Sequence, residues 1–549
     1  MSSTASCAAP GGRLRPDRTR LALAATLLAA LALRAVDLTA TGLWIDEANG
    51  VLTAERSLAG LLENLRLDSS PPLFYLLLHA WIALFGDSPL ALRLLPVLCG
   101  TALVAATAWA GREFASSRVG LVAALYVAVS PVQVHYSQKV RMYALLPLLA
   151  LVATVLLVRT LRTRSLRDEA GWLIATTLAL YTHNFAVHLL PAQALLIVGS
   201  GALRREPVRF LRAAAIGALA YAPWLPTALA QLGNGDHYAW FLPYWQAWGA
   251  GGVLQRSLLS LSPGGEYVIV AGLRRLGDLW HGVLTLVCIV LAAFGIWRRV
   301  AGRPVRALAL DVWPLVLFAV PLLSATALSV LGLPSFVPGR VDQMGLPAFA
   351  LLVAAGLCAI EWAWLRVGLL VALVAVGTFS SLALRPVHGD VGWVREGTRE
   401  RRFRVEGSEA QLAEAIAARW QPGDVVVFTS LVRAPVAYYL RRAGIDGPFV
   451  SFPRDTARHL GSQNDARLLA DRGALAREAA AVVARARALA AGGGRIFVVR
   501  SLAAVNAPLS DRALEVRFGL ARVADLGAYA QEGVNAVAQL HVFRDRKKP

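Results

Sequence analysis

Residues 142–158 read MYALLPLLALVATVLLV, and the segment 159–167 that follows them, RTLRTRSLR, carries four arginines. An apolar helix of about 20 residues crosses the hydrocarbon core of a bilayer. Lysine and arginine collect in the loops that stay in the cytoplasm. This stretch therefore predicts a membrane-spanning helix that ends on the cytoplasmic side.

Similar apolar runs recur through residues 1–385 and predict a polytopic all-α transmembrane bundle. Eleven runs are interpreted as spans, and the short run Pro72 to Phe85 as a re-entrant or interfacial helix, so we expect about 11–13 helices. With the N-terminus in the cytoplasm and the C-terminus outside, every strongly basic loop faces the cytoplasm. The eleven runs lie near 21–36, 90–110, 119–134, 142–158, 171–184, 185–200, 212–232, 281–298, 311–331, 345–363 and 366–384.

The N-terminal run resembles a signal peptide, since the arginines of residues 13–20 precede it. No convincing small-residue cleavage site follows, so we interpret it as an uncleaved first helix. The expected location is therefore the inner (plasma) membrane of a bacterial cell, with many passes.

Composition supports the same class of protein. The chain is 56% hydrophobic with a formal net charge of +20, and its basic residues gather at the ends of apolar runs. That distribution argues against a nucleic-acid partner. The four cysteines, at positions 7, 99, 288 and 358, have no metal-ligand spacing, so neither a disulfide framework nor a zinc site is expected.

Residues 386–549 are less hydrophobic and predict a separate extracytoplasmic α/β domain. Residues 424–428 and 495–499 are interpreted as buried strands, and residues 474–491 as a helix that ends at three glycines. No glycine-rich loop links a strand to a helix at the spacing of a nucleotide site.

Two adjacent carboxylates, Asp46 and Glu47, lie in the first outer loop, residues 37–71, close to the expected membrane surface. A carboxylate with a tuned pKa can act as a general base. The plainer interpretation is an acidic pair at the start of an amphipathic helix, residues 48–65.

Further polar residues stand at outer ends of the spans, against the usual distribution of charge. A cation close to the membrane usually has an anionic partner. That partner could be a lipid phosphate held in a specific site. Alternatively, the long side chains could simply extend to the lipid headgroups, which needs no specific site. Arg340 has a second candidate partner in Asp342. The polar candidates are Tyr136, Gln138, Lys139, Arg141, Tyr143, His183 and Arg340.

The order of these motifs resembles that of the bacterial membrane glycosyltransferases of the C superfamily, in the branch related to protein O-mannosyltransferases and aminoarabinose transferases (family 39). The resemblance spans about residues 20–385. It rests on Asp46-Glu47, on residues 70–75 (SPPLFY), on residues 136–143 (YSQKVRMY), on residues 181–183 (YTH) and on the Arg340 loop.

The resemblance implies transfer of a hexosyl or pentosyl group from a polyprenyl-phosphate donor to a lipid, glycan or protein acceptor outside the cytoplasm. Asp46 would be the general base and the anomeric configuration would invert. Glu47 would hold the acceptor or a divalent metal such as Mg or Mn. Arg141 and Arg340 would neutralise the leaving phosphate.

Two positions depart from the family pattern, in which an acidic residue commonly stands at Lys139 and a tyrosine after Arg340. Two other functions compete with the transferase: a transporter or flippase of a lipid-linked saccharide, and a non-catalytic membrane scaffold. The polar residues gather at one face and no similarity between halves is visible, which favours the transferase over a transporter.

Overall fold

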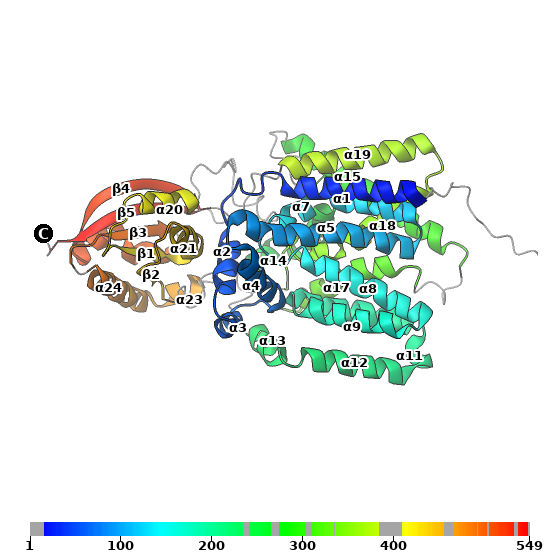
Figure 1. The fold of residues 1–549 in the computed structure, drawn as a ribbon, viewed down its shortest axis with the longest axis horizontal. Helices are drawn as coiled ribbons and strands as arrows, with labels where there is room; N and C mark the ends of the chain where they lie inside the picture. Colours follow the sequence, from blue (N-terminus) through cyan, green and yellow to red (C-terminus); the bar gives the residue numbers. More distant parts are fainter. Residues whose placement is uncertain are drawn as a thin grey trace, which may run out of the picture.

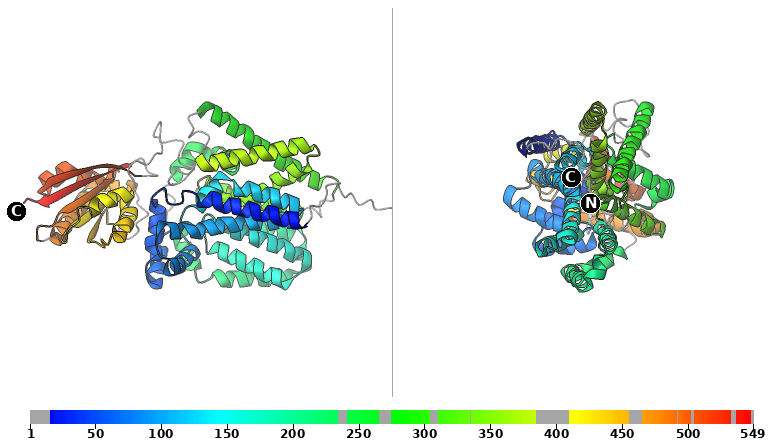
Figure 2. Two further views of the ribbon diagram at one scale, coloured as in Figure 1. Left: turned by 45° about the horizontal axis from the view of Figure 1, so that its top comes forward. Right: turned by 90° about the vertical axis from the view of Figure 1, so that its right-hand side faces the viewer.

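The structure is a computed structural model that describes residues 16–233, 241–264, 274–303, 310–333, 335–383, 409–454, 465–490, 492–501, 504–531 and 536–546. Cys7, the arginines at 13 and 15 and residues 386–408 lie outside these ranges. Two bodies follow one another along the long axis, a helical bundle and a smaller sheet domain (Figure 1). A second view shows the same separation (Figure 2).

Helices lie on all eleven apolar runs of the sequence. The bundle helices are α1 (Pro16–Ala35), α5 (Pro89–Phe114), α6 (Ser117–Ala128), α7 (Pro131–Ser137), α8 (Leu145–Thr163), α9 (Leu166–Leu180), η1 (Asn184–His188), α10 (Leu189–Gly199), α11 (Ala202–Arg205), α12 (Pro207–Tyr221), α13 (Leu225–Leu232), α14 (Leu242–Leu261), α15 (Arg274–Val300), α17 (Trp313–Val330), η4 (Asp342–Gly345), α18 (Leu346–Ala359) and α19 (Ala363–Ala383).

Within the described ranges, six helices are long and apolar enough to cross a membrane, or up to eight if each of two bent pairs is one span. This count is lower than the eleven spans predicted. The bent pairs are α6 with α7, at 64°, and α12 with α13, at 77°. Prolines at the start of α7 and within the first turn of α13 fit these breaks, because proline removes a backbone hydrogen bond. The helices α9 and α10 have only 15 and 11 residues.

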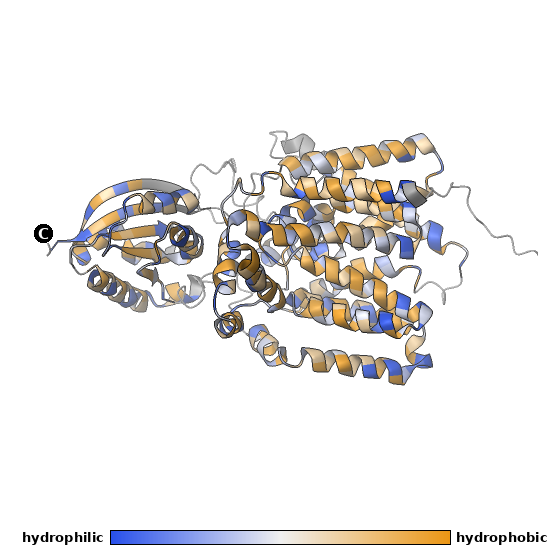
Figure 3. Cartoon of the chain, in the orientation of Figure 1, coloured by the Kyte–Doolittle hydropathy of each residue, from blue (hydrophilic) through white to orange (hydrophobic). Residues whose placement is uncertain are grey.

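Hydrophilic residues gather at the end of the bundle that lies away from the sheet domain (Figure 3). There, Arg159 pairs with Asp168 and with Glu113, and Arg299 pairs with Asp311. The loops that the sequence assigned to the cytoplasm thus share one side of the molecule.

Three short helices lie at the opposite end, between the bundle and the sheet domain (Figure 1): α2 (Ile45–Ala54), α3 (Leu58–Leu67) and α4 (Leu73–Phe85). The helix α4 has 13 residues and is apolar. It occupies the run that the sequence predicted to be re-entrant or interfacial.

The sheet domain has five strands in the order β2-β1-β3-β5-β4. The strands β2, β1 and β3 are parallel, as expected where helices connect them, and β5 and β4 add an antiparallel edge. The predicted strands and helix are confirmed. The elements are α20 (Glu409–Ala417), β1 (Val425–Thr429), η6 (Ser430–Val432), α21 (Arg433–Arg442), β2 (Phe449–Phe452), α23 (Asp465–Ala470), α24 (Arg472–Leu489), β3 (Ile496–Ser501), η7 (Ala504–Leu509), η8 (Ala513–Arg517), β4 (Leu520–Gln531) and β5 (Ala536–Asp545).

Close approach of two helix backbones holds part of the bundle together. A Cβ atom added to Gly356 of α18 would lie 1.8 Å from the carbonyl oxygen of Leu291 on α15. Only glycine fits there, and small residues are the common means of packing helices within membranes.

We therefore expect Gly356→Ala to lower the free energy of unfolding in detergent by about 1–3 kcal/mol, as for other overpacked cores, and so to lower the melting temperature. Gly368→Ala on α19 is the matched control, because an added Cβ there meets nothing within 4 Å. Equal melting temperatures for the two variants would show that the α15–α18 contact does not limit stability.

Candidate functional site

The helix α2 presents two consecutive carboxylates in its first turn, and they face different surroundings. The side chain of Glu47 is 0% exposed, whereas that of Asp46 is 24% exposed. Successive residues of an α-helix are rotated by roughly 100°, so one side chain points inward when its neighbour points to the open side.

Glu47 is held by donors from three parts of the chain. Its carboxylate accepts hydrogen bonds from the backbone N–H of Trp44 at 3.0 Å and of Val140 at 2.8 Å. The Arg93 guanidinium donates to both of its oxygens, at 3.2 and 3.3 Å. Burial raises the pKa of the Glu47 carboxyl, but Arg93 and Lys139 lower it more in total, so its pKa lies below the ordinary value.

Arg93, from the membrane helix α5, also organises the loop before α2. It donates to the carbonyl oxygens of Leu38 at 2.7 Å, Thr41 at 2.9 Å and Gly42 at 2.6 Å. All of its bonds therefore go to the segment 38–47. Arg93 was not among the candidate residues predicted from the sequence, although a lone cation in an apolar run is a signal that a buried partner exists.

Asp46 forms an ion pair with Arg340, which lies just before η4. The Arg340 guanidinium also donates to the Tyr143 hydroxyl at 2.5 Å, and it lies over the rings of Trp44 and Tyr143 at 5.6 and 5.1 Å. The sequence left two partners open for Arg340. Its acidic partner is Asp46, and Asp342 accepts from the backbone N–H of Gly339 at 3.0 Å.

A second cation lies beside the first. Arg141 donates to the Tyr75 hydroxyl at 2.9 Å and lies over the Tyr143 ring at 5.7 Å. One of its nitrogens is 3.4 Å from the backbone oxygen of Asp46. Two guanidinium groups, two phenols and one partly exposed carboxylate thus form one polar cluster.

Residues 135–143, which the sequence placed at an outer end of a span, are packed inside the protein. The helix α7 and the turn after it are almost entirely buried, and Lys139 is 4% exposed. Gln138 donates to the backbone oxygens of Arg34 and Val36, at 2.9 and 3.1 Å, and Tyr136 packs edge-on against Tyr143. These contacts make Gln138 and Tyr136 supports of the cluster.

His183 completes the ring of aromatic groups around Tyr143, with ring centroids 6.1 Å apart. Its Nδ1 accepts from the backbone N–H of Phe185 at 3.0 Å, so the other ring nitrogen carries the proton of the neutral form. The fold therefore brings Asp46, Arg141, Tyr143, His183 and Arg340 together from four separate segments.

The two carboxylates do not fit a divalent metal site. Each is already matched by a guanidinium group, Asp46 by Arg340 and Glu47 by Arg93. A fully buried Glu47 whose carboxylate accepts four hydrogen bonds favours a structural role over the metal or acceptor role that the resemblance implied. Across the described segments, no group of three or more His, Cys, Asp or Glu side chains is arranged to hold a metal.

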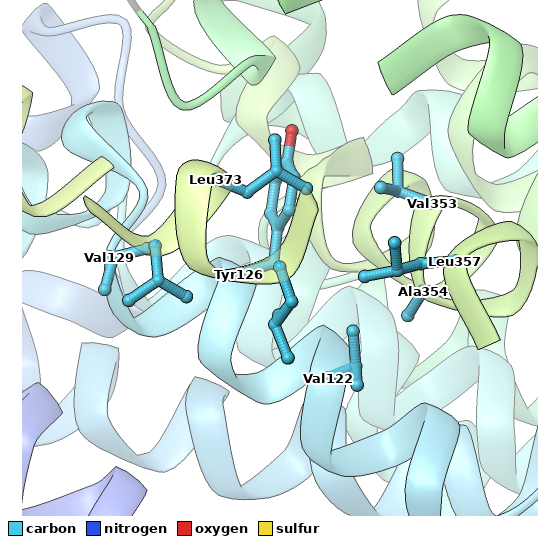
Figure 4. Close-up of a pocket in the computed structure, with 9 residues that line it drawn as sticks. Val122, Tyr126, Val129, Val353, Ala354, Leu357 and Leu373 are labelled. Carbon is cyan, nitrogen blue, oxygen red and sulfur yellow. The ribbon is translucent and has the colours of Figure 1, made fainter. Parts of the chain in front are cut away.

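An apolar cavity lies elsewhere in the bundle, between α6, α18 and α19 (Figure 4). Its lining is aliphatic apart from Tyr126, whose hydroxyl donates to the Leu261 carbonyl oxygen at 2.8 Å. It contains no residue of the polar cluster and no group for acid–base chemistry.

We expect Glu47→Gln to destabilise the protein, because it leaves Arg93 buried without its counter-charge. Removing one partner of a buried ion pair costs about 3–5 kcal/mol. The contribution of Glu47 is fully present at neutral pH and is lost as the pH falls through its lowered native pKa. The difference in melting temperature between wild type and variant should therefore persist at neutral pH and shrink only under acid conditions.

The control for this substitution is Glu63→Gln, which changes an exposed glutamate of α3 and should alter stability by less than about 0.5 kcal/mol. A Glu47→Gln variant as stable as that control would contradict the role assigned to the pair.

Comparisons with known proteins agree with this architecture. The model of the family described as dolichyl-phosphate-mannose-protein mannosyltransferase matches residues 69–226. No curated protein matches the sequence significantly.

Solved structures share the fold over most of the chain. ArnT from Cupriavidus metallidurans bound to undecaprenyl phosphate superposes with a TM-score of 0.53 at 14% identity, covering 96% of this chain and 98% of that chain. The Archaeoglobus fulgidus oligosaccharyltransferase in complex with Zn and sulfate has a TM-score of 0.51 at 12% identity, covering 87% and 68%. The same archaeal enzyme, AglB, with an inhibitory peptide and a dolichol phosphate, also has a TM-score of 0.51, at 10% identity and 88% and 69% coverage. The chain is thus a multi-pass membrane protein that shares its fold with ArnT and with the archaeal oligosaccharyltransferase.

Proposed function

We propose that this protein transfers a sugar from a polyprenyl-phosphate donor to an acceptor hydroxyl on the extracytoplasmic side of the membrane. The observation that carries the proposal is the contact between Asp46 and Arg340, at the end of the bundle that lies beside the sheet domain. It places a partly exposed carboxylate beside two guanidinium groups, which is the pairing of base and phosphate ligand that such a transfer needs.

Arg340 and Arg141 would bind the phosphate of the donor. A guanidinium group suits a phosphate through parallel hydrogen bonds, and its charge stabilises the negative charge that grows on the leaving group. As Arg340 turns toward the phosphate, the Asp46 carboxylate would be released from the ion pair and could face the acceptor hydroxyl.

In the chemical step, the acceptor oxygen forms a bond to the anomeric carbon while the bond from that carbon to the phosphate oxygen breaks. The hydroxyl proton passes to Asp46 and polyprenyl phosphate leaves. One displacement of this kind inverts the anomeric configuration. The polyprenyl tail of the donor would remain in the bilayer. Because the donor is a lipid phosphate and not a nucleotide sugar, the site needs no nucleotide-binding fold.

We also propose the orientation of the protein in the membrane. Arg159, Arg162 and Arg299 lie at the end of the bundle opposite α2, and Arg162 contacts the backbone at Leu310 there. Basic loops mark the cytoplasmic side. The polar cluster and the sheet domain would then face outward.

We expect Asp46→Asn to reduce transfer by about 10²–10⁴-fold, the usual contribution of a general base. The assay is release of polyprenyl phosphate by purified protein from a panel of polyprenyl-phosphate sugars, with melting temperature as the folding check. Glu63→Gln serves as the control, since it also converts an acid to an amide in the first outer segment. Equal release by wild type and Asp46→Asn would remove Asp46 from the chemistry.

A further inference from the structure

The sheet domain docks onto the bundle through α21. Ala434 and Tyr438 of this helix are buried in the same hydrophobic core as the bundle. The Tyr438 hydroxyl donates to the backbone oxygen of Asp87 at 2.8 Å, and Arg442 pairs with the Asp87 carboxylate at 2.7 Å. Asp87 lies in the loop between α4 and α5, so these contacts anchor the domain beside the site.

Two other residues of α21 contact the segments that flank α2, the helix that carries Asp46. The backbone N–H of Leu43 donates to the Tyr439 hydroxyl at 2.7 Å. At the other end of α2, Arg441 forms an ion pair with Glu55. The sheet domain therefore contacts both ends of α2 (Figure 1).

With the contact at Leu43, both polar atoms of a single peptide group have a hydrogen-bond partner. The carbonyl oxygen of Gly42 and the N–H of Leu43 belong to the same planar peptide group. Arg93 of the bundle donates to that oxygen at 2.6 Å, and Tyr439 of the sheet domain accepts from that N–H. With both of its polar atoms bound, the group cannot rotate freely, and Asp46 follows it after three residues.

We propose that Tyr439 is a positioning residue for Asp46. Its hydroxyl, together with Arg93, fixes the peptide between Gly42 and Leu43 and so sets the direction in which α2 presents the Asp46 carboxylate. The inference rests on the proposed function, and it gives the C-terminal domain a part in the reaction.

The physical basis is the burial of the donor. Leu43 is 0% exposed, so its N–H has no water to replace the tyrosine hydroxyl. A buried donor left without a partner is strongly unfavourable, and the turn should shift to satisfy it. A displacement of about 1 Å at a reacting group can lower a rate by 10²-fold.

The test is Tyr439→Phe in the full-length protein, which removes one oxygen and keeps the ring. We expect kcat to fall by roughly tenfold with an unchanged KM for the polyprenyl-phosphate sugar, because the donor phosphate is held by other residues. Hydrogen–deuterium exchange of the peptides that cover residues 43–55 should become faster. A purely structural role in domain folding would lower stability without this split between kcat and KM.

The matched control is Arg442→Met on the same helix. It breaks the Arg442–Asp87 pair, in which the two side chains are 36% and 42% exposed, and it leaves the contacts of Tyr439 and Arg441 with Leu43 and Glu55 in place. We expect wild-type kcat and wild-type exchange in residues 43–55. A second check reverses the charges of the Arg441–Glu55 pair. Arg441→Glu should speed hydrogen–deuterium exchange in α2, and the double variant Arg441→Glu with Glu55→Arg should restore the slow exchange of the wild type.

Each outcome decides between the proposals. Unchanged exchange in Tyr439→Phe overturns the positioning role, as does faster exchange with unchanged kcat in an active enzyme. An equal loss of kcat in Arg442→Met also overturns it, because overall docking would then control the rate. If the wild type transfers no sugar, the proposed function fails, and exchange alone still shows whether Tyr439 holds α2.

Discussion

The buried ion pair between Arg93 and Glu47 is the contact on which the candidate site depends. A charge removed from water is strongly unfavourable unless a counter-charge and hydrogen bonds replace its hydration. Here the guanidinium binds a carboxylate and three carbonyl oxygens, and the carboxylate also binds two backbone N–H groups. Because Arg93 belongs to a membrane helix and Glu47 to α2, this pair fixes the loop before α2 to the bundle.

That fixed loop separates the roles of two neighbouring acids. Glu47 is buried in its ion pair with Arg93, whereas the Asp46 carboxylate is partly exposed at the protein surface. The cations at positions 141 and 340 lie beside Asp46, and aromatic rings cover their faces. Such a cluster keeps an exposed acid and its counter-charges at fixed positions before any substrate binds.

A break in a membrane helix delivers part of this cluster. Between α6 and α7 the chain bends by 64°, which leaves carbonyl oxygens without their helical partners. Arg34 of α1 donates to two of them, those of Val127 and Ala128, and also to the Ser137 hydroxyl. Within a bilayer, irregular backbone is tolerated where protein groups satisfy it. The bend lets residues 139–143 lie buried beside α2, in a segment that the sequence placed in an outer loop.

The sequence by itself determined the bundle, the side on which its basic loops meet, the α/β character of the C-terminal region and the acidic pair as the candidate site. These follow from local patterns, because bilayer thickness sets the length of apolar runs and backbone geometry sets the period of helices and strands. Only the tertiary structure decided the partners. Arg340 lies 294 positions from Asp46, Arg93 lies 46 positions from Glu47, and Tyr439 lies 396 positions from Leu43. No local pattern encodes such pairings, since they arise when packing of the whole chain brings buried polar groups together and each must find a partner.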